Sequence, residues 1–209
     1  IKPSQKIIYL NSNSGYGIGE KNKYCDENSP LNPVSLYGIT KIDSEEIVKK
    51  TKNFICFRLA TVFGYSYRMR TDLLVNFFVN EGLKKKKIEI FEPKFRRNFI
   101  HVRDVVNAIV YSIQNFNKLK NSTYNLGLSN ANITKLQLAK KIKKYLKDIK
   151  IKIITGKKDP DKRDYFVSNK KIEKKGFKCT ISLEEGIKET IKVLKNKKQK
   201  IKNNYIPKS

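Results

Sequence analysis

The stretch that decides the fold begins with the apolar segment Lys6-Ile7-Ile8-Tyr9-Leu10 and ends with a second one, Phe54-Ile55-Cys56-Phe57-Arg58-Leu59. Continuous apolar runs of this length are typical of strands buried on both faces in a parallel sheet. Between them, residues 35–50 carry a helical pattern, and polar, glycine-bearing sequence follows the first run over residues 11–17. Strand, helix and strand in this order predict a βαβ unit of an α/β protein.

Alternating elements continue along the rest of the chain. Apolar spacing predicts a helix beginning near Thr71 and a second helix that carries Val106, Ile109, Val110 and Ile113 on one stripe. Two more helices are expected after the capping pairs Thr134/Gln137 and Ser182/Glu185. Short strands are expected at 88–91, 124–127 and 151–154, and the lysine-rich residues 195–209 predict a loose tail.

The composition is that of a folded chain. With 209 residues, 39% of them hydrophobic and 11% aromatic, the chain can bury a sizeable core and is not intrinsically disordered. No apolar run approaches the roughly 18 residues that span a bilayer, and no signal-peptide pattern opens the sequence. We therefore expect a cytoplasmic protein with no membrane partner.

The formal net charge of +27 raises the question of nucleic acid. Only seven of the 46 basic residues are arginine, and surface lysine without an arginine or aromatic readout face is weak evidence for such a partner. We expect a solvated basic surface and no nucleic acid. A noncatalytic basic protein that binds nucleic acid stays open as an alternative of a different class.

The metal-binding and redox residues are few. Cys25, Cys56 and Cys179 are odd in number and far apart, and His101 is the one histidine of the chain. This set fits neither a disulfide framework nor a zinc site, so reduced thiols and no metal are expected.

Three residues could carry proton chemistry. Ser12 follows the first predicted strand, and Tyr37 and Lys41 are spaced so that both lie on one helix face, one turn apart. A cation held beside the tyrosine favours its phenolate and suits it to proton transfer. Taken alone, the spacing also fits an exposed tyrosine and a solvated lysine. The glycines at 15, 17 and 19 are not followed directly by a helix, which disfavours a phosphate-binding turn there.

Several motifs stand in a fixed order from Ile7 to about Leu194. They are Tyr9 to Gly17, Glu27 to Pro33, Ser35 to Lys41, Arg58 to Gly64, Arg97 to Asp104 and Tyr124 to Gly127. In this order and spacing the chain resembles the extended short-chain dehydrogenase/reductases, and among them the NAD-dependent nucleotide-sugar epimerase/dehydratase group.

The resemblance implies the second half of a doubly wound Rossmann sheet plus a small mixed α/β substrate-binding lobe. Residues 1–70 would belong to the NAD-binding domain and 71–194 mainly to the lobe, with elements that return to the sheet. The glycine-rich cofactor turn of the family would precede Ile1, so we expect an N-terminally truncated fragment that lacks about 100 to 120 residues. NAD is the expected cofactor, and NADP stays open because the discriminating residue would also lie upstream.

The resemblance also assigns roles. Tyr37 would be the acid/base at a sugar hydroxyl, Lys41 would support it and contact the nicotinamide ribose, and Ser12 would bind the same sugar oxygen. The expected substrate contacts add Asn13, Thr61, Arg97 and Arg163, with the two arginines on the nucleotide diphosphate. For Arg163, an ion pair with Asp161 or Asp164 stays open, and His101 is expected to be a packed structural residue.

Departures from the family pattern narrow the reaction. Thr61 stands where asparagine is common. Asn13 and Ser14 stand where the 4,6-dehydratases carry aspartate and glutamate, and epimerases acting at C3 and C5 carry a cysteine at the position of Ser14. We therefore expect oxidation at a sugar C4 of a nucleotide-diphosphate sugar, by a 4-epimerase or 4-dehydrogenase that is a homodimer at full length. A 4,6-dehydratase is the alternative.

Overall fold

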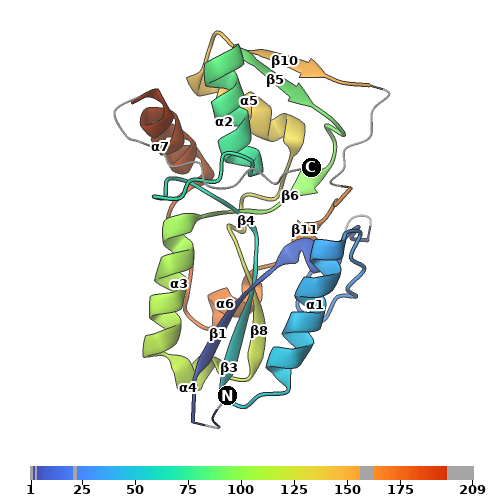
Figure 1. The fold of residues 1–209 in the computed structure, drawn as a ribbon, viewed down its shortest axis with the longest axis vertical. Helices are drawn as coiled ribbons and strands as arrows, with labels where there is room; N and C mark the ends of the chain where they lie inside the picture. Colours follow the sequence, from blue (N-terminus) through green and yellow to red (C-terminus); the bar gives the residue numbers. More distant parts are fainter. Residues whose placement is uncertain (1, 3, 21–22, 156–161, 197–209) are drawn as a thin grey trace.

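A three-stranded parallel sheet forms the centre of the computed structural model, which describes residues 2, 4–20, 23–155 and 162–196 (Figure 1). Its strands are β1 (Ile7–Ser12), β3 (Phe54–Leu59) and β8 (Ser122–Leu126), in the order β1-β3-β8. Helix α1 (Leu36–Lys49) connects β1 to β3, and the Ser35 side chain accepts a hydrogen bond from the amide of Gly38 at its start. The predicted βαβ unit is confirmed.

Helices cover both faces of this sheet. On one face, Ile55 and Phe57 are fully buried and pack in an apolar cluster with Val105 and Ala108 of α3 (Val102–Gln114). The side chain of Arg58 points to the other face, where α1 lies (Figure 1). Successive strand residues face opposite sides, so continuous apolar sequence is what a sheet covered on both faces requires. The short helices α4 (Phe116–Leu119) and α6 (Lys170–Lys174) complete this half.

A second half of the molecule, at the top of Figure 1, is a mixed α/β lobe. Strands β5 (Lys87–Ile90) and β10 (Lys150–Ile153) pair in parallel, and helices α2, α5 and α7 pack against them. The helices span Leu74–Lys85, Lys135–Tyr145 and Leu183–Lys195. Both predicted capping boxes, at the starts of α5 and α7, are present.

Short strands join the two halves. Strand β4 (Thr61–Phe63) pairs in parallel with β7 (Phe99–His101), and β6 (Arg96–Arg97) pairs antiparallel with β9 (Ile133–Thr134). The 3-10 turn η1 (Asn13–Tyr16) follows β1 directly. The remaining pair, β2 and β11, consists of Tyr24–Cys25 and Phe166–Val167.

The structure corrects two details of the predicted elements. Helix α2 begins at Leu74 and not near Thr71, since Leu73 has extended backbone angles at the N-cap position and the Arg70–Asp72 ion pair lies in the turn before it. Of the apolar stripe of α3, Ile109 packs against the core cluster, whereas Val106, Val110 and Ile113 are 53%, 47% and 61% exposed.

The structure also bears on the predictions for the cysteines, the domain boundary, the C-terminal tail and membrane-spanning segments. The thiols of all three cysteines are free. The boundary near residue 70 stays a prediction, with β8, α3 and α6 returning to the sheet from beyond it. Lys195 ends α7, and residues 197–209 of the expected tail lie outside the described part of the chain. Among the described helices, none is long and apolar enough to cross a membrane.

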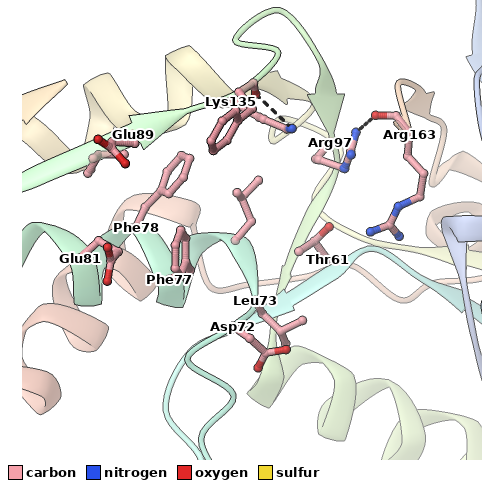
Figure 2. A pocket seen from close by; sticks show the side chains of 13 residues that line it. Thr61, Asp72, Leu73, Phe77, Phe78, Glu81, Glu89, Arg97, Lys135 and Arg163 are labelled. Atoms are coloured by element: carbon pink, nitrogen blue, oxygen red, sulfur yellow. Dashed lines mark hydrogen bonds between the residues drawn. The ribbon is translucent and has the colours of Figure 1, made fainter. Parts of the chain in front are cut away.

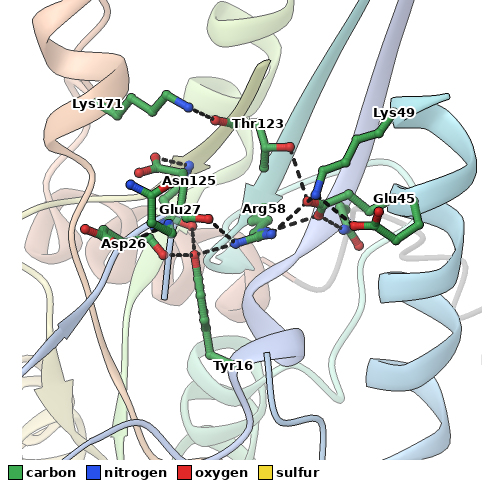
Figure 3. Close-up of polar contacts among 12 residues, drawn as sticks. Tyr16, Asp26, Glu27, Glu45, Lys49, Arg58, Thr123, Asn125 and Lys171 are labelled. Carbon is green, nitrogen blue, oxygen red and sulfur yellow. Dashed lines mark hydrogen bonds and ion pairs between the residues drawn. The ribbon is translucent and has the colours of Figure 1, made fainter. Parts of the chain in front are cut away.

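A buried polar layer lies between α1 and the sheet (Figure 3). Arg58 donates from Nη2 to Glu45 Oε1 at 2.7 Å and from Nε to Glu45 Oε2 at 3.0 Å, and both side chains are almost fully buried. Asn11 of β1 and Thr123 of β8 donate to the same carboxylate at 2.5 and 3.2 Å. One residue of α1 therefore binds all three strands of the sheet.

The charges in this layer compensate one another. Burial by itself would raise the pKa of Glu45, but hydrogen bonds and attraction from Arg58 and Lys49 lower it to about 2. The Arg58 Nη1 also donates to the Tyr16 hydroxyl at 3.0 Å, and burial raises the pKa of Tyr16, so this hydroxyl stays protonated. Glu45 is thus ionised across the neutral range and neutralised by its buried partner.

Replacement of Glu45 by glutamine should lower the free energy of unfolding by about 3 to 5 kcal/mol, because it leaves the buried Arg58 guanidinium without its counter-charge. Glu46→Gln is the matched control, since Glu46 is 57% exposed and forms a surface ion pair with Lys49. The control should cost less than about 1 kcal/mol. Urea unfolding of both variants measures the difference, and equal midpoints would contradict this account of the layer.

Candidate functional site

Two adjoining cavities lie where the carboxyl ends of β1 and β3 meet the lobe. The first, which we call the serine cavity, has a volume of about 480 Å³ and is lined by Ser12, Ser14 and Tyr37 on one side. The second, which we call the aromatic cavity, has a volume of about 320 Å³ and is lined by Phe77, Phe78 and Phe91. The two cavities adjoin, because their linings share four residues: Thr61, Asp72, Leu73 and Arg163.

The serine cavity opens at the end of β1. Ser12 is the last residue of β1, and its Oγ accepts a hydrogen bond from the backbone amide of Ser14 at 3.1 Å. The two hydroxyl oxygens lie 2.8 Å apart, and Arg163 Nη1 donates to Ser14 Oγ. The turn η1 therefore places two hydroxyl groups and a guanidinium on the same wall of the cavity.

Tyr37 and Lys41 come from the first turns of α1. Tyr37 lines the serine cavity and is 54% exposed, and the Lys41 Nζ lies 5.9 Å from the centre of its ring. The ammonium group also contacts β1, with the Leu10 carbonyl at 3.3 Å and the Tyr9 hydroxyl at 3.5 Å. The predicted spacing thus holds a cation beside the tyrosine, and α1 holds both at the end of β1.

Figure 2 shows the aromatic cavity between α2 and β5, with positive side chains gathered at its inner end. Phe77 is 39% exposed, so an aromatic ring is left open on the wall. Arg97, Lys135 and Arg163 line the end that adjoins the serine cavity, and the Lys135 Nζ donates to the Phe91 carbonyl at 3.3 Å. Such a space fits a flat ring at one end and an anion at the other.

A set of arginine contacts builds the junction of the two cavities. Arg97 is 2% exposed, and its Nη1 donates to the backbone carbonyls of Arg96 and Arg163. Arg96 binds Asp164 through its Nε and Nη2 at 2.8 and 3.1 Å. Of the two ion pairs that were open for Arg163, Asp164 is therefore engaged by Arg96, and Asp161 lies outside the described residues.

The remaining predicted residues differ in their positions. Thr61 lines both cavities. Asn13 is 1% exposed, lines neither cavity, and both polar atoms of its amide lack a hydrogen-bond partner. His101 is fully buried, as expected, and its Nδ1 accepts from the Arg103 amide at the start of α3. Burial lowers the pKa of His101. The role of Asn13 in substrate binding stays a prediction.

Some cavity residues were not singled out from the sequence. Arg70 and Asp72 line the serine cavity and form a two-point ion pair at 2.7 and 2.5 Å. Phe77 and Phe91 carry only an apolar signal, which core residues share. Ser14 was noted for its departure from the family pattern and not for a contact. Lys135, which is 3% exposed, gave no signal beyond its place after a helix cap.

Comparison with known proteins identifies the family. Residues 1–127 match the model of the NAD dependent epimerase/dehydratase family. The chain is 28% identical over 200 residues to a Methanocaldococcus jannaschii protein provisionally named a UDP-glucose 4-epimerase, covering 91% of this chain and 63% of that protein. It is 30% identical over 128 residues to UDP-glucuronate 4-epimerase 4 of Arabidopsis thaliana, covering 56% and 29%.

Solved structures share the fold. The Thermotoga maritima UDP-glucose 4-epimerase, solved with UDP-glucose, superposes with a TM-score of 0.80 at 25% identity, covering 92% of this chain and 64% of that one. The Bacillus anthracis dTDP-glucose 4,6-dehydratase, solved with NAD, gives 0.80 at 22% identity, covering 94% and 64%.

The chain thus spans about half to two thirds of the proteins that it matches along most of its own length. Its parallel sheet with helices on both faces is the Rossmann arrangement that the resemblance implied. With more than half of its residues matched by the family model, this chain belongs to the NAD-dependent epimerase/dehydratase family.

Proposed function

We propose that this chain supplies the catalytic residues and the substrate site of an NAD-dependent enzyme that oxidises the C4 hydroxyl of a nucleotide-diphosphate sugar, as a 4-epimerase or a 4-dehydrogenase. The observation that carries the proposal is that the two cavities adjoin at Arg163, which lines both of them. A sugar in the serine cavity and a base in the aromatic cavity would place the diphosphate at the arginines between them. The named epimerase relatives support the C4 position.

The side chains divide the work as follows. Tyr37 would take the proton of the C4 hydroxyl, with Lys41 favouring its phenolate, and Ser12 would hydrogen-bond the same oxygen. Arg163 and Arg97 would neutralise the diphosphate, and Arg97 would also hold the backbone of Arg163 in place. Thr61, at the junction, would contact the sugar.

Tyr37 and Lys41, at the end of β1, fit the nicotinamide end of NAD. Lys41 donates to the end of β1, beside the strand edge that no described strand covers, so it and Tyr37 would hold the nicotinamide ribose there. When bound there, NAD would supply the hydride acceptor for oxidation at C4 and, for a 4-epimerase, the hydride donor for reduction of the resulting ketone on its other face. NADP stays open, since the described residues do not include a site for the adenosine ribose.

A 4,6-dehydratase is less well supported. Water loss needs a base and an acid beside the oxidised carbon. The dehydratase positions for these groups hold Asn13, which lines neither cavity, and Ser14. Asp72 is the one carboxylate in the described lining of the serine cavity, and it is bound at two points by Arg70. The likeness to a dehydratase structure at 22% identity shows the fold alone.

We also propose a homodimer. The outer face of α1 exposes Leu36, Ile39 and Ile47 by 76%, 45% and 65%, and a second copy could cover these side chains. Light scattering of the holoenzyme measures this.

We call the full-length protein loaded with NAD the holoenzyme. Its product should retain the oxygen atoms of the nucleotide-sugar substrate. Mass spectrometry should show either an isomer of equal mass or a product about 2 Da lighter, from loss of one hydride and one proton. A product about 18 Da lighter, by one water, would overturn the assignment in favour of dehydration.

Tyr37→Phe in the same holoenzyme should lower kcat by roughly 10² to 10⁴, because the variant loses a positioned acid/base and keeps the ring. The affinity for the nucleotide-sugar should change little. Tyr67→Phe is the matched control, since Tyr67 is 90% exposed and lines neither cavity, and it should keep full activity. Full turnover by the Tyr37 variant would refute its catalytic role.

Arg163→Ala should weaken binding of a nucleoside diphosphate by about 10-fold or more, since a charge-assisted hydrogen bond contributes about 1.5 to 3 kcal/mol. The 209-residue chain contains both cavities, so calorimetry with UDP and GDP on this chain measures the loss. Arg68→Ala removes an equal charge from an exposed residue outside both linings and should bind as the parent does. Equal affinities of the two variants for the nucleoside diphosphate would refute the proposal that the diphosphate binds at Arg163.

A further inference from the structure

A short chain of hydrogen bonds leads from Arg163 to Ser12. Arg163 Nη1 donates to Ser14 Oγ, and Ser14 Oγ lies 2.8 Å from Ser12 Oγ. The backbone amide of Ser14 donates to Ser12 Oγ as well, at 3.1 Å. Ser14 is 1% exposed, and all three contacts are partly buried. The geometry between the two hydroxyls leaves either one as the donor.

The positive charge of Arg163 decides which atom is the donor in each of these hydrogen bonds. A guanidinium only donates hydrogen bonds, so the Ser14 oxygen must accept from it. A positive charge orients a neighbouring hydroxyl with its oxygen toward the charge and its proton away. The proton of Ser14 then points to Ser12 Oγ. In this direction Ser14 accepts one bond and donates the next, an arrangement in which the bonds strengthen one another.

Ser12 can then act toward a ligand only as a hydrogen-bond donor. Its oxygen accepts from the Ser14 hydroxyl and from the Ser14 amide, which uses both of its acceptor positions. Its own proton is directed away from Ser14, and Ser12 lines the serine cavity. We propose that Arg163, acting through Ser14, fixes Ser12 as a hydrogen-bond donor to the reacting sugar oxygen. Ser14 and Arg163 are then positioning residues for Ser12.

This inference rests on the proposed function and makes it more specific. When the sugar hydroxyl passes its proton to Tyr37, negative charge develops on its oxygen. A donor that already points at that oxygen stabilises the charge without reorienting in the transition state. The five N–H groups of one guanidinium allow Arg163 to serve Ser14 and a phosphate together. Ser14 therefore takes part although it replaces the acidic residue of the dehydratases.

A double-mutant cycle in the NAD-loaded holoenzyme tests the coupling. Ser14→Ala should lower kcat by about 10-fold or more while KM stays within about twofold, because one preoriented donor contributes 10² to 10³ in kcat and its orientation a part of that. In the background of Ser12→Ala, the same change should have no further effect. Ser129→Ala is the matched control, since it removes a 2.6 Å hydrogen bond to Glu173, and neither residue lines the two cavities. It should leave kcat unchanged.

Two kinetic results would overturn the proposal. One is a Ser14→Ala enzyme with the kcat of the parent. The other is a pair of losses that multiply in the double variant, which would show that Ser14 acts independently of Ser12. Thermal unfolding of each variant separates a loss of fold from a loss of orientation.

Neutron diffraction on the deuterated 209-residue chain tests the proton positions without any activity. The expected map has a deuteron bonded to Ser14 Oγ on the line to Ser12 Oγ, and the Ser12 deuteron turned into the serine cavity. A Ser12 deuteron that points at Ser14 would refute the proposal. If the parent holoenzyme converted no nucleotide-sugar, the proposed function would fail. The neutron map would still show whether Ser14 donates to Ser12 or accepts from it.

Discussion

Glu45 carries a negative charge into the layer between α1 and the sheet, and Arg58 neutralises it through two hydrogen bonds. A buried carboxylate without this partner would cost several kcal/mol, so the pair is formed only when α1 and β3 are correctly docked. Asn11 and Thr123 extend the same contact to β1 and β8. Because Tyr37 and Lys41 lie two turns and one turn before Glu45, the pair sets the helix register that places them at the end of β1.

A second polar assembly plays the same part at the junction with the lobe. Asp164 binds the side chain of Arg96, and Arg97 binds the backbone of Arg163. Residues distant in sequence are thus held in adjacent positions, and the cations Arg97 and Arg163 both line the aromatic cavity where it adjoins the serine cavity. Like charges gather there at an electrostatic cost, which Asp164 offsets in part and which a bound diphosphate would offset further. The Glu45–Arg58 pair and the contacts of Arg96 and Arg97 therefore fix the positions of the side chains that line the two cavities.

Local sequence was enough for most of the architecture and for the relative positions of the candidate residues Tyr37 and Lys41. Buried strands, helix caps and the Tyr37/Lys41 spacing are encoded by neighbours, so β1, α1, β3 and both capping boxes appear where they were expected. The start of α2 was predicted too early, since Leu73 has extended backbone angles at the N-cap position. The apolar stripe of α3 was found, but the exposure of its residues to solvent depends on what the helix packs against.

The sequence by itself determined the α/β class, the family motifs and the candidate residues Ser12, Tyr37 and Lys41, because each depends on spacing within one or two elements. Only the tertiary structure decided that Glu45 binds all three strands, that Asp164 binds Arg96, and that Arg163 reaches Ser14. These partners are separated by up to 149 positions in the chain. Hydrogen bonds and ion pairs act over a few ångströms, so such contacts are settled by the packing of the elements and not by local sequence.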